Sequence, residues 1–260
     1  MEIVAGNLNF RRPALSQAMR DRDTGPIQDI AQECKKRGAD YLNLYFGSHG
    51  DAEDMKFVIS AVQEVCDLRL FLDAVDPKVL EAGIKECRRP PIINGVSGDP
   101  AVRDALISLA ECYNTEMVVL AERDGTPRDA DERLEILEEV VEAANAANIA
   151  NDRIIVDPII LHLGGGIGQE HSVAVQEVLR VLPETFTSPV RSICWISNIS
   201  AGIPDKLRPA VNSVYLAMLA GQGLDMAMVN AMDPEIMRTA RLIKALKNEE
   251  LFAVAEAELG

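Results

Sequence analysis

Short apolar runs of strand length alternate with amphipathic stretches along the whole chain, and this alternation constrains the fold most. There are eight apolar runs, at residues 3–5, 41–46, 69–72, 91–93, 117–120, 154–156, 192–196 and 224–229. Between them, apolar residues recur at helical spacing, as at Leu134, Leu137 and Val141. Strands that alternate with helices predict βαβ units and a parallel sheet. Eight such units in 260 residues predict an α/β fold of the TIM-barrel type, (β/α)8, as a single domain over residues 1–260.

Three of the predicted helices begin with the pair Asp-Pro, at Asp76-Pro77, Asp99-Pro100 and Asp233-Pro234. In each pair the carboxylate suits the capping position and the proline suits the first turn of the helix. A doubly wound sheet is the alternative architecture, and it would need a glycine fingerprint after the first strand. Residues 5–9 read Ala-Gly-Asn-Leu-Asn without that fingerprint, so the barrel is favoured. The acidic, alanine-rich tail after Asn248 predicts an extra helix for packing or oligomer contact.

The charge of the chain argues against several kinds of partner. With 41 acidic and 26 basic residues, the net charge of −15 repels nucleic acid and anionic membranes. No apolar run is long enough to span a bilayer. The five cysteines are scattered and form no paired motif, which is typical of reduced thiols in a cytoplasmic protein. No group of cysteines and histidines has the spacing of a zinc site. We therefore expect a cytoplasmic protein with no protein-bound metal and no nucleic-acid or membrane partner.

Polar residues stand at or beside the ends of the apolar runs, where a barrel places its active site. They are Asn7, Asn9, Asn43, Tyr45, Asp73, Asp76, Asn94, Glu122, Asp157, Ser197, Asn198 and Asn230. Capping or loop solvation explains any single one of them. Asn94 and Asp157, however, follow uninterrupted apolar runs, and a buried polar group without a partner costs several kcal/mol. Carboxylates and amides together suit a heterocycle with adjacent N–H donors and ring acceptors, such as the edge of a pterin or a purine.

Other candidate chemistries have weaker support in the sequence. The glycine-rich run 164–168 does not match the dinucleotide pattern, so we expect a loop over the site rather than a phosphate cradle. His171 opens a predicted helix and is interpreted as a solvated or capping residue, and Cys194 as a core residue. Asp73 and Asp157 suggest a glycosidase pair, but only 4% of the residues are aromatic, and sugars usually need aromatic platforms.

Four strand-end motifs occur in a fixed order: Leu72-Asp73, Ile93-Asn94, Val156-Asp157-Pro158 and Ile196-Ser197-Asn198-Ile199-Ser200. In this order, on an eightfold β/α chain, they resemble the pterin-binding methyltransferases. The closest resemblance is to the methyltetrahydrofolate:corrinoid/iron–sulfur protein methyltransferases. The resemblance implies a TIM barrel, usually a homodimer, that moves a methyl group between N5 of tetrahydrofolate and the cobalt of a corrinoid. It also implies a corrinoid protein as partner and no metal ligand on this chain.

The resemblance assigns roles to individual residues. Asp73, Asn94 and Asp157 would hold the pterin ring, with Ser197 and Arg208 in the same mouth. Asn198 would be a mobile amide that donates a hydrogen bond to N5, and the carboxylates Asp73 and Asp157 would share in catalysis through the proton network. Four further residues at the strand ends are weaker candidates for the site: Asn9, Asn43, Tyr45 and Glu122.

The chain departs from the family pattern in ways that affect the reaction direction. Residues 5–7 read Ala-Gly-Asn where the family prefers an acidic motif, and Asn43 and Tyr45 replace an expected Asp and Asn. Fewer acids beside the pterin favour transfer from a methylated corrinoid protein to tetrahydrofolate. A dihydropteroate synthase-like enzyme is one alternative, although it would need a lysine where this chain has Ile196-Ser197-Asn198. A non-catalytic folate- or corrinoid-binding protein is the other.

Overall fold

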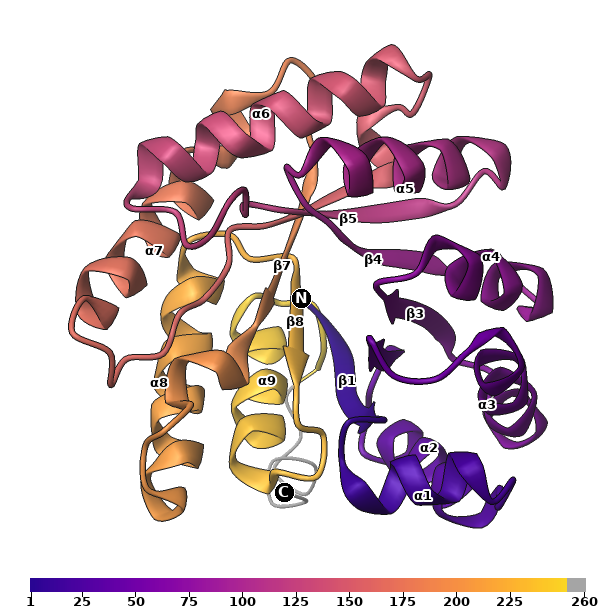
Figure 1. The fold of residues 1–260 in the computed structure, drawn as a ribbon. Helices are drawn as coiled ribbons and strands as arrows, with labels where there is room; N and C mark the ends of the chain where they lie inside the picture. Colours follow the sequence, from indigo (N-terminus) through magenta and orange to yellow (C-terminus); the bar gives the residue numbers. More distant parts are fainter. Residues whose placement is uncertain (252–260) are drawn as a thin grey trace.

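The computed structural model describes residues 1–251 and forms a closed barrel of eight parallel strands (Figure 1). The strands are β1 (Glu2–Asn9), β2 (Tyr41–Gly47), β3 (Arg69–Ala74), β4 (Ile92–Val96), β5 (Glu116–Leu120), β6 (Ile154–Asp157), β7 (Arg191–Trp195) and β8 (Met226–Val229). Each strand pairs with its neighbours in sequence, and the register Glu2↔Met226 between β1 and β8 closes the barrel. The predicted (β/α)8 architecture is confirmed.

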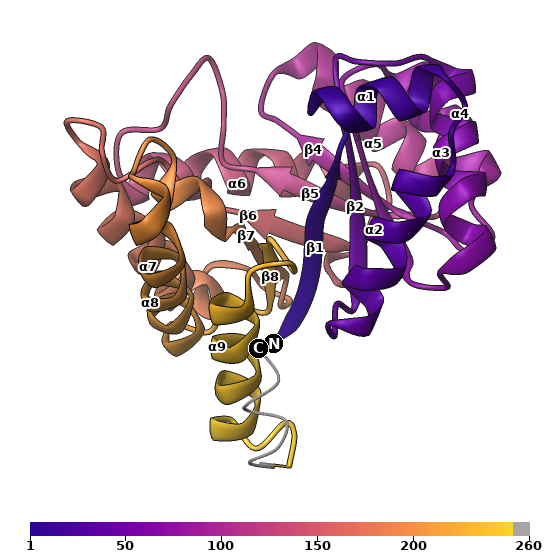
Figure 2. The same cartoon turned by 90° about the horizontal axis from the view of Figure 1, so that it is seen from below.

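Helices surround this sheet (Figures 1 and 2). They are α1 (Pro13–Arg20), α2 (Gly25–Lys36), α3 (Ala52–Val65), α4 (Pro77–Glu86), α5 (Pro100–Cys112), α6 (Ala130–Ala146), α7 (Gly168–Thr185), α8 (Arg208–Gly221) and α9 (Pro234–Leu246). Short 3-10 helices lie at η1 (Asn151–Arg153), η2 (Ile196–Ser200) and η3 (Asp205–Leu207). Within residues 1–251, no helix combines the length and apolar character needed to cross a membrane.

The predicted helix starts are also confirmed. Asp76, Asp99 and Asp233 each accept a hydrogen bond from a backbone N–H in the first turn of the helix that follows. These bonds satisfy amide groups that have no partner inside the helix. The extra helix predicted after Asn248 lies mostly outside the described residues.

The barrel interior is filled by side chains and is not a pore. One layer of buried residues points inward from seven of the strands: Val4, Phe71, Ile92, Val118, Ile155, Ile193, Met226 and Met228. The alternating residues of the same strands pack outward against the helices, as Ile3, Leu72 and Val119 do. Because the interior is packed, no ligand can bind inside the barrel, and its active site is expected at one of the two ends.

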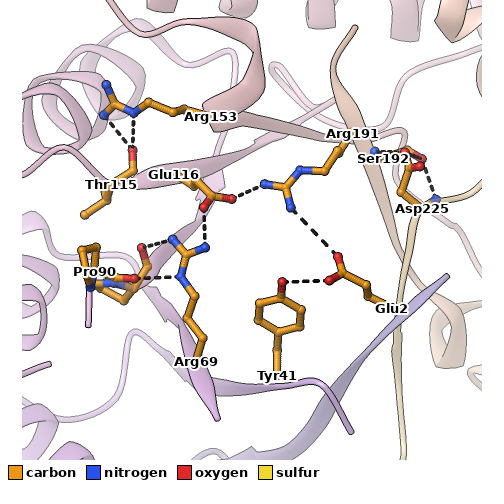
Figure 3. A network of polar contacts seen from close by, with 11 residues as sticks. Glu2, Tyr41, Arg69, Pro90, Thr115, Glu116, Arg153, Arg191, Ser192 and Asp225 are labelled. Atoms are coloured by element: carbon orange, nitrogen blue, oxygen red, sulfur yellow. Dashed lines mark hydrogen bonds and ion pairs between the residues drawn. The ribbon is translucent and has the colours of Figure 1, made fainter. Parts of the chain in front are cut away.

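A network of charged residues occupies the end of the barrel where the strands begin (Figure 3). Glu116 forms ion pairs with Arg69 and Arg191, and Arg191 lies 4.0 Å from Glu2. The hydroxyl of Tyr41 donates to Glu2 at 3.0 Å. Each of these five residues is the first residue of its strand. Their charged groups satisfy one another, so the opposite end of the barrel is the place to look for a ligand site.

Candidate active site

A cavity of 540 Å³ opens at the carboxyl ends of the strands. Six of the residues that the sequence predicts for the site line it together: Tyr45, Asp73, Asn94, Glu122, Asp157 and Asn198. They come from five successive strands or the segments just after them, and from η2, so residues far apart in sequence converge here. This convergence follows from the parallel arrangement of the strands, which places all their carboxyl ends on one face.

Asp73 and Asn94 form the first polar group of the cavity. The amide Nδ2 of Asn94 donates to Asp73 Oδ2 at 3.0 Å and to Asn43 Oδ1 at 3.3 Å. Asn43 is fully buried behind them, so it supports the site from below rather than facing the cavity. Burial raises the pKa of Asp73 to about 7, while the amides of Asn43 and Asn94 act in the opposite direction.

Asp157 forms the second polar group, at the end of β6. Its Oδ1 accepts a hydrogen bond of 2.8 Å from the backbone N–H of Ile159. Burial raises the pKa of this carboxyl to about 7; the Ile159 N–H lowers it, the charge of Glu122 raises it and Arg133 lowers it. Solvent reaches Asp73 and Asp157 through the cavity, and protein surrounds them on the other sides. A carboxyl in this setting is readily ionised by a ligand that brings N–H donors.

A second cavity of 450 Å³ lies beside the first and shares Trp195 and Asn198 with it. It contains three further predicted residues, Asn9, Ser197 and Arg208. Arg208 Nε lies 3.3 Å from Ser200 Oγ, and its guanidinium is 3.6 Å from Asp205. The structure therefore divides the predicted site between two adjoining cavities, with Asn198 lining both.

Trp195 is a site residue that the sequence reasoning missed. It ends β7, and its ring meets that of Tyr45 edge-on with the centroids 5.4 Å apart. Trp195 is the only tryptophan of the chain, and it directly precedes the motif Ile196-Ser197-Asn198. Its position beside this motif is the sequence signal that identifies it as a site residue.

Two expectations about the loop after β6 need correction. Within the described chain, none of residues 164–168 lines either cavity, so the glycine-rich run does not cover the site. Gly168 is instead required by packing, because a Cβ there would lie 2.3 Å from the His162 carbonyl oxygen. His171 is neither solvated nor a cap: it is 1% exposed, and its Nδ1 lies 3.0 Å from Arg133 Nη2. Cys194 is fully buried, as expected.

Within the described part of the chain, no group of three His, Cys, Asp or Glu side chains is arranged to hold a metal ion. The polar groups of the two cavities are carboxyls, amides, hydroxyls and arginines, and no lysine lines either cavity in residues 1–251. This donor set suits hydrogen bonding to a neutral heterocycle.

The family model for pterin binding enzymes matches residues 14–230, which include every strand end described above except that of β1. This chain belongs to the pterin binding enzyme family. The family that the four strand-end motifs indicated is thereby confirmed.

Curated relatives of this pterin binding enzyme include a methyltransferase and a methionine synthase. It is 26% identical over 247 residues to methylcorrinoid:tetrahydrofolate methyltransferase from Eubacterium limosum, covering 91% of this chain and 88% of that protein. It is 30% identical over 240 residues to methionine synthase from Mycobacterium tuberculosis. That match covers 87% of this chain but only 19% of methionine synthase, so it concerns one part of a much longer protein.

Solved structures with the same fold include two dihydropteroate synthases. The Xanthomonas albilineans enzyme with 4-aminobenzoic acid superposes with a TM-score of 0.70 at 17% identity, over 97% of this chain and 94% of that one. The Yersinia pestis enzyme gives a TM-score of 0.68 at 18% identity, over 95% and 93% of the two chains. At this level of identity the likeness establishes the barrel fold alone.

Proposed function

We propose that this pterin binding enzyme transfers a methyl group between a corrinoid and N5 of tetrahydrofolate. The observation that carries the proposal is the pair of adjoining cavities that meet at Asn198 and Trp195. Methyl transfer between two large cofactors needs both of them at one point, with the reacting atoms aligned. A pterin in the first cavity and a corrinoid over the second would meet at this shared wall.

The first cavity fits a pterin. Asp73 and Asp157 each offer carboxylate oxygens to adjacent N–H groups of the ring. The Asn94 amide offers its oxygen as a further acceptor, because its nitrogen already donates to Asp73 and Asn43. Hydrogen bonds from the N–H donors of the ring would offset the free-energy cost of burying these carboxylates, because such donors stabilise the ionised form. Tyr45 and Trp195 supply apolar surface for the ring faces.

The second cavity fits the periphery of a corrinoid, which carries carboxamide side chains. Four asparagines line it: Asn9, Asn198, Asn212 and Asn230. Amide groups pair well with amides, since each provides donors and acceptors. We therefore propose a corrinoid protein as the partner that presents its cofactor here.

We propose that Asn198 acts on N5. The corrinoid supplies the cobalt–carbon bond that breaks as the N5–carbon bond forms, with the electron pair left on cobalt. The N5 proton of tetrahydrofolate then has to leave, and Asn198 can hold it by a hydrogen bond while Asp157 and Asp73 receive it through water. We propose this direction, from methylcorrinoid to folate, because Asn7 and Asn43 stand where the family pattern prefers acids, and because the Eubacterium limosum relative is named for it.

A spectroscopic assay tests the proposal. We expect the purified protein to demethylate methylcobalamin faster with tetrahydrofolate than without it, which the absorbance change of the corrinoid reports. Equal rates in both samples, together with no transfer from methyltetrahydrofolate to cob(I)alamin, would overturn it. Folate binding without transfer would then favour the non-catalytic binder, and product formation from 4-aminobenzoate and a pterin pyrophosphate would favour the synthase.

We also propose a homodimer that forms through α7 and α8. An apolar groove of 360 Å³ lies between these helices, with Val214 62% and Met218 45% exposed beside it. Such a surface is typical of a protein interface. Light scattering should give twice the chain mass, and Val214→Asp with Met218→Asp should give a monomer, whereas Leu246→Asp on α9 should leave the mass unchanged. A monomeric wild-type protein at micromolar concentration would contradict the proposal.

A further inference from the structure

Arg133 of α6 is a fully buried arginine that neither cavity contains. Within residues 1–251 no carboxylate forms an ion pair with it, and burial lowers its pKa. A buried cation without a carboxylate is costly, so it needs good hydrogen bonds to persist. Its guanidinium has three such contacts: Nε donates to Pro158 O at 2.8 Å, Nη1 to Asp129 O at 2.8 Å, and Nη2 lies 3.0 Å from His171 Nδ1.

These three acceptors belong to three separate segments around the first cavity. Asp129 closes the loop after β5, whose residues 122–125 line the cavity. Pro158 follows Asp157 directly, and His171 lies in the first turn of α7. Because arginine only donates, Nδ1 of His171 must be the unprotonated acceptor, so the imidazole is neutral. Burial, and next the charge of Arg133, lower the pKa of His171, in agreement with this.

The contact with Pro158 has a specific consequence for Asp157. The Pro158 carbonyl and the Ile159 N–H belong to the same peptide unit. Arg133 therefore holds one side of this peptide, and the Asp157 carboxyl accepts from the other side at 2.8 Å. Ile159 has φ of +61°, in the left-handed region that β-branched residues avoid because it strains the backbone. A strained turn of this kind persists only when its surroundings hold it in place.

We propose that Arg133 is a positioning residue: it fixes the Pro158–Ile159 peptide so that the Ile159 N–H points at Asp157 and orients this carboxylate for the pterin. The proposal rests on the proposed function in so far as Asp157 is the pterin ligand. His171 helps to hold Arg133 in place, because its Nδ1 accepts a hydrogen bond from Arg133 Nη2, which would otherwise have no partner. The hydrogen bond and the positive charge both favour ionised Asp157.

The ligand-free protein allows a test that does not depend on folate. Arg133→Met should raise the pKa of Asp157. A pH titration of the Asp157 carboxyl by ¹³C NMR measures this pKa, and the Asp157→Asn variant assigns the signal. Arg133→Lys, which keeps the charge, should recover part of the shift. The other groups that influence this carboxyl, Glu122 after β5 and Cys194 on β7, remain unchanged in these variants. An unchanged Asp157 pKa in Arg133→Met would overturn the proposal. If this variant does not fold, the Asp157 pKa is measured in Arg133→Lys, and an unchanged value there would overturn the proposal.

Folate affinity gives the functional readout, with a matched control. Arg133→Met should weaken tetrahydrofolate binding about tenfold, as expected for the loss of a hydrogen bond to a charged group. Arg153 also donates to backbone carbonyls, those of Thr115 and Ala110, but at the opposite end of the barrel (Figure 3). Arg153→Met should lower stability without changing the affinity or the Asp157 pKa. Equal behaviour of the two variants would overturn the proposal. A wild-type protein that binds no folate would instead contradict the proposed function, while the NMR measurement would still decide the role of Arg133.

Ile159→Gly provides an internal check. Glycine adopts positive φ without strain, so the turn would no longer depend on Arg133. In the Ile159→Gly protein, Arg133→Met should therefore shift the Asp157 pKa less than it does in the wild type. Equal shifts in the two backgrounds would contradict a role in holding the strained turn.

Discussion

Replacing Asn198 with alanine is expected to lower methyl-transfer turnover about 100- to 1000-fold, the usual cost of removing one hydrogen bond that acts on the transition state. The affinity for tetrahydrofolate should change by no more than about threefold, because the proposed pterin contacts come from Asp73, Asn94 and Asp157. Asn198 is exposed at the wall between the two cavities, and its amide forms no hydrogen bond to any other described residue. It is therefore free to follow N5 as charge changes there.

Single-turnover kinetics and calorimetric binding measure the two effects separately. Asn151→Ala is a matched control, since it removes an amide from η1 at the opposite end of the barrel. It should leave both quantities at their wild-type values. Equal losses of turnover and affinity in Asn198→Ala would show a binding residue rather than a residue that acts on the transition state. Unchanged turnover would remove Asn198 from the mechanism.

The fold could be predicted from the sequence because each strand of the barrel contains a short apolar run. The predicted run 154–156 and β6 (Ile154–Asp157) differ by one residue. The largest differences occur at the mouth. The first run was predicted as 3–5 and β4 as 91–93, whereas the strands are Glu2–Asn9 and Ile92–Val96. Polar Asn7 and Asn94 interrupt the apolar pattern there, yet both remain in the sheet because other side chains satisfy their amides.

The candidate site could be predicted only as far as the strand ends. Asp73, Asn94 and Asp157 converge for a reason that the topology supplies, and the sequence reasoning found them. Arg133 could not be found in this way, because it stands in a charged run, Asp131-Glu132-Arg133, that predicts a solvated helix face. Its burial depends on His171 and Pro158, which are 38 and 25 residues away. No local pattern encodes such a contact.

Asp157→Asn is expected to weaken tetrahydrofolate binding by about 1–3 kcal/mol, or about 5- to 150-fold, near pH 8. Asparagine keeps the shape and one acceptor oxygen but loses the charge that pairs with the ring N–H donors. The Ile159 N–H can still donate to the remaining oxygen, so the turn should stay in place. Calorimetry of wild type and variant measures the loss, and equal affinities at this pH would contradict the assignment of Asp157 as a pterin ligand.

The pH dependence of this affinity separates the two carboxyls. Burial raises the pKa of both Asp73 and Asp157 to about 7, so both carboxyls are mostly protonated in the free protein below this pH. Each carboxyl must then lose its proton before it can accept the N–H donors of the ring. Wild-type affinity should therefore decline from about pH 8 to about pH 5.5, with up to two protons released per folate bound. Asp157→Asn cannot take up a proton at this position, so its decline should correspond to one proton, that of Asp73. A variant that keeps the wild-type slope would show that Asp157 does not titrate when folate binds.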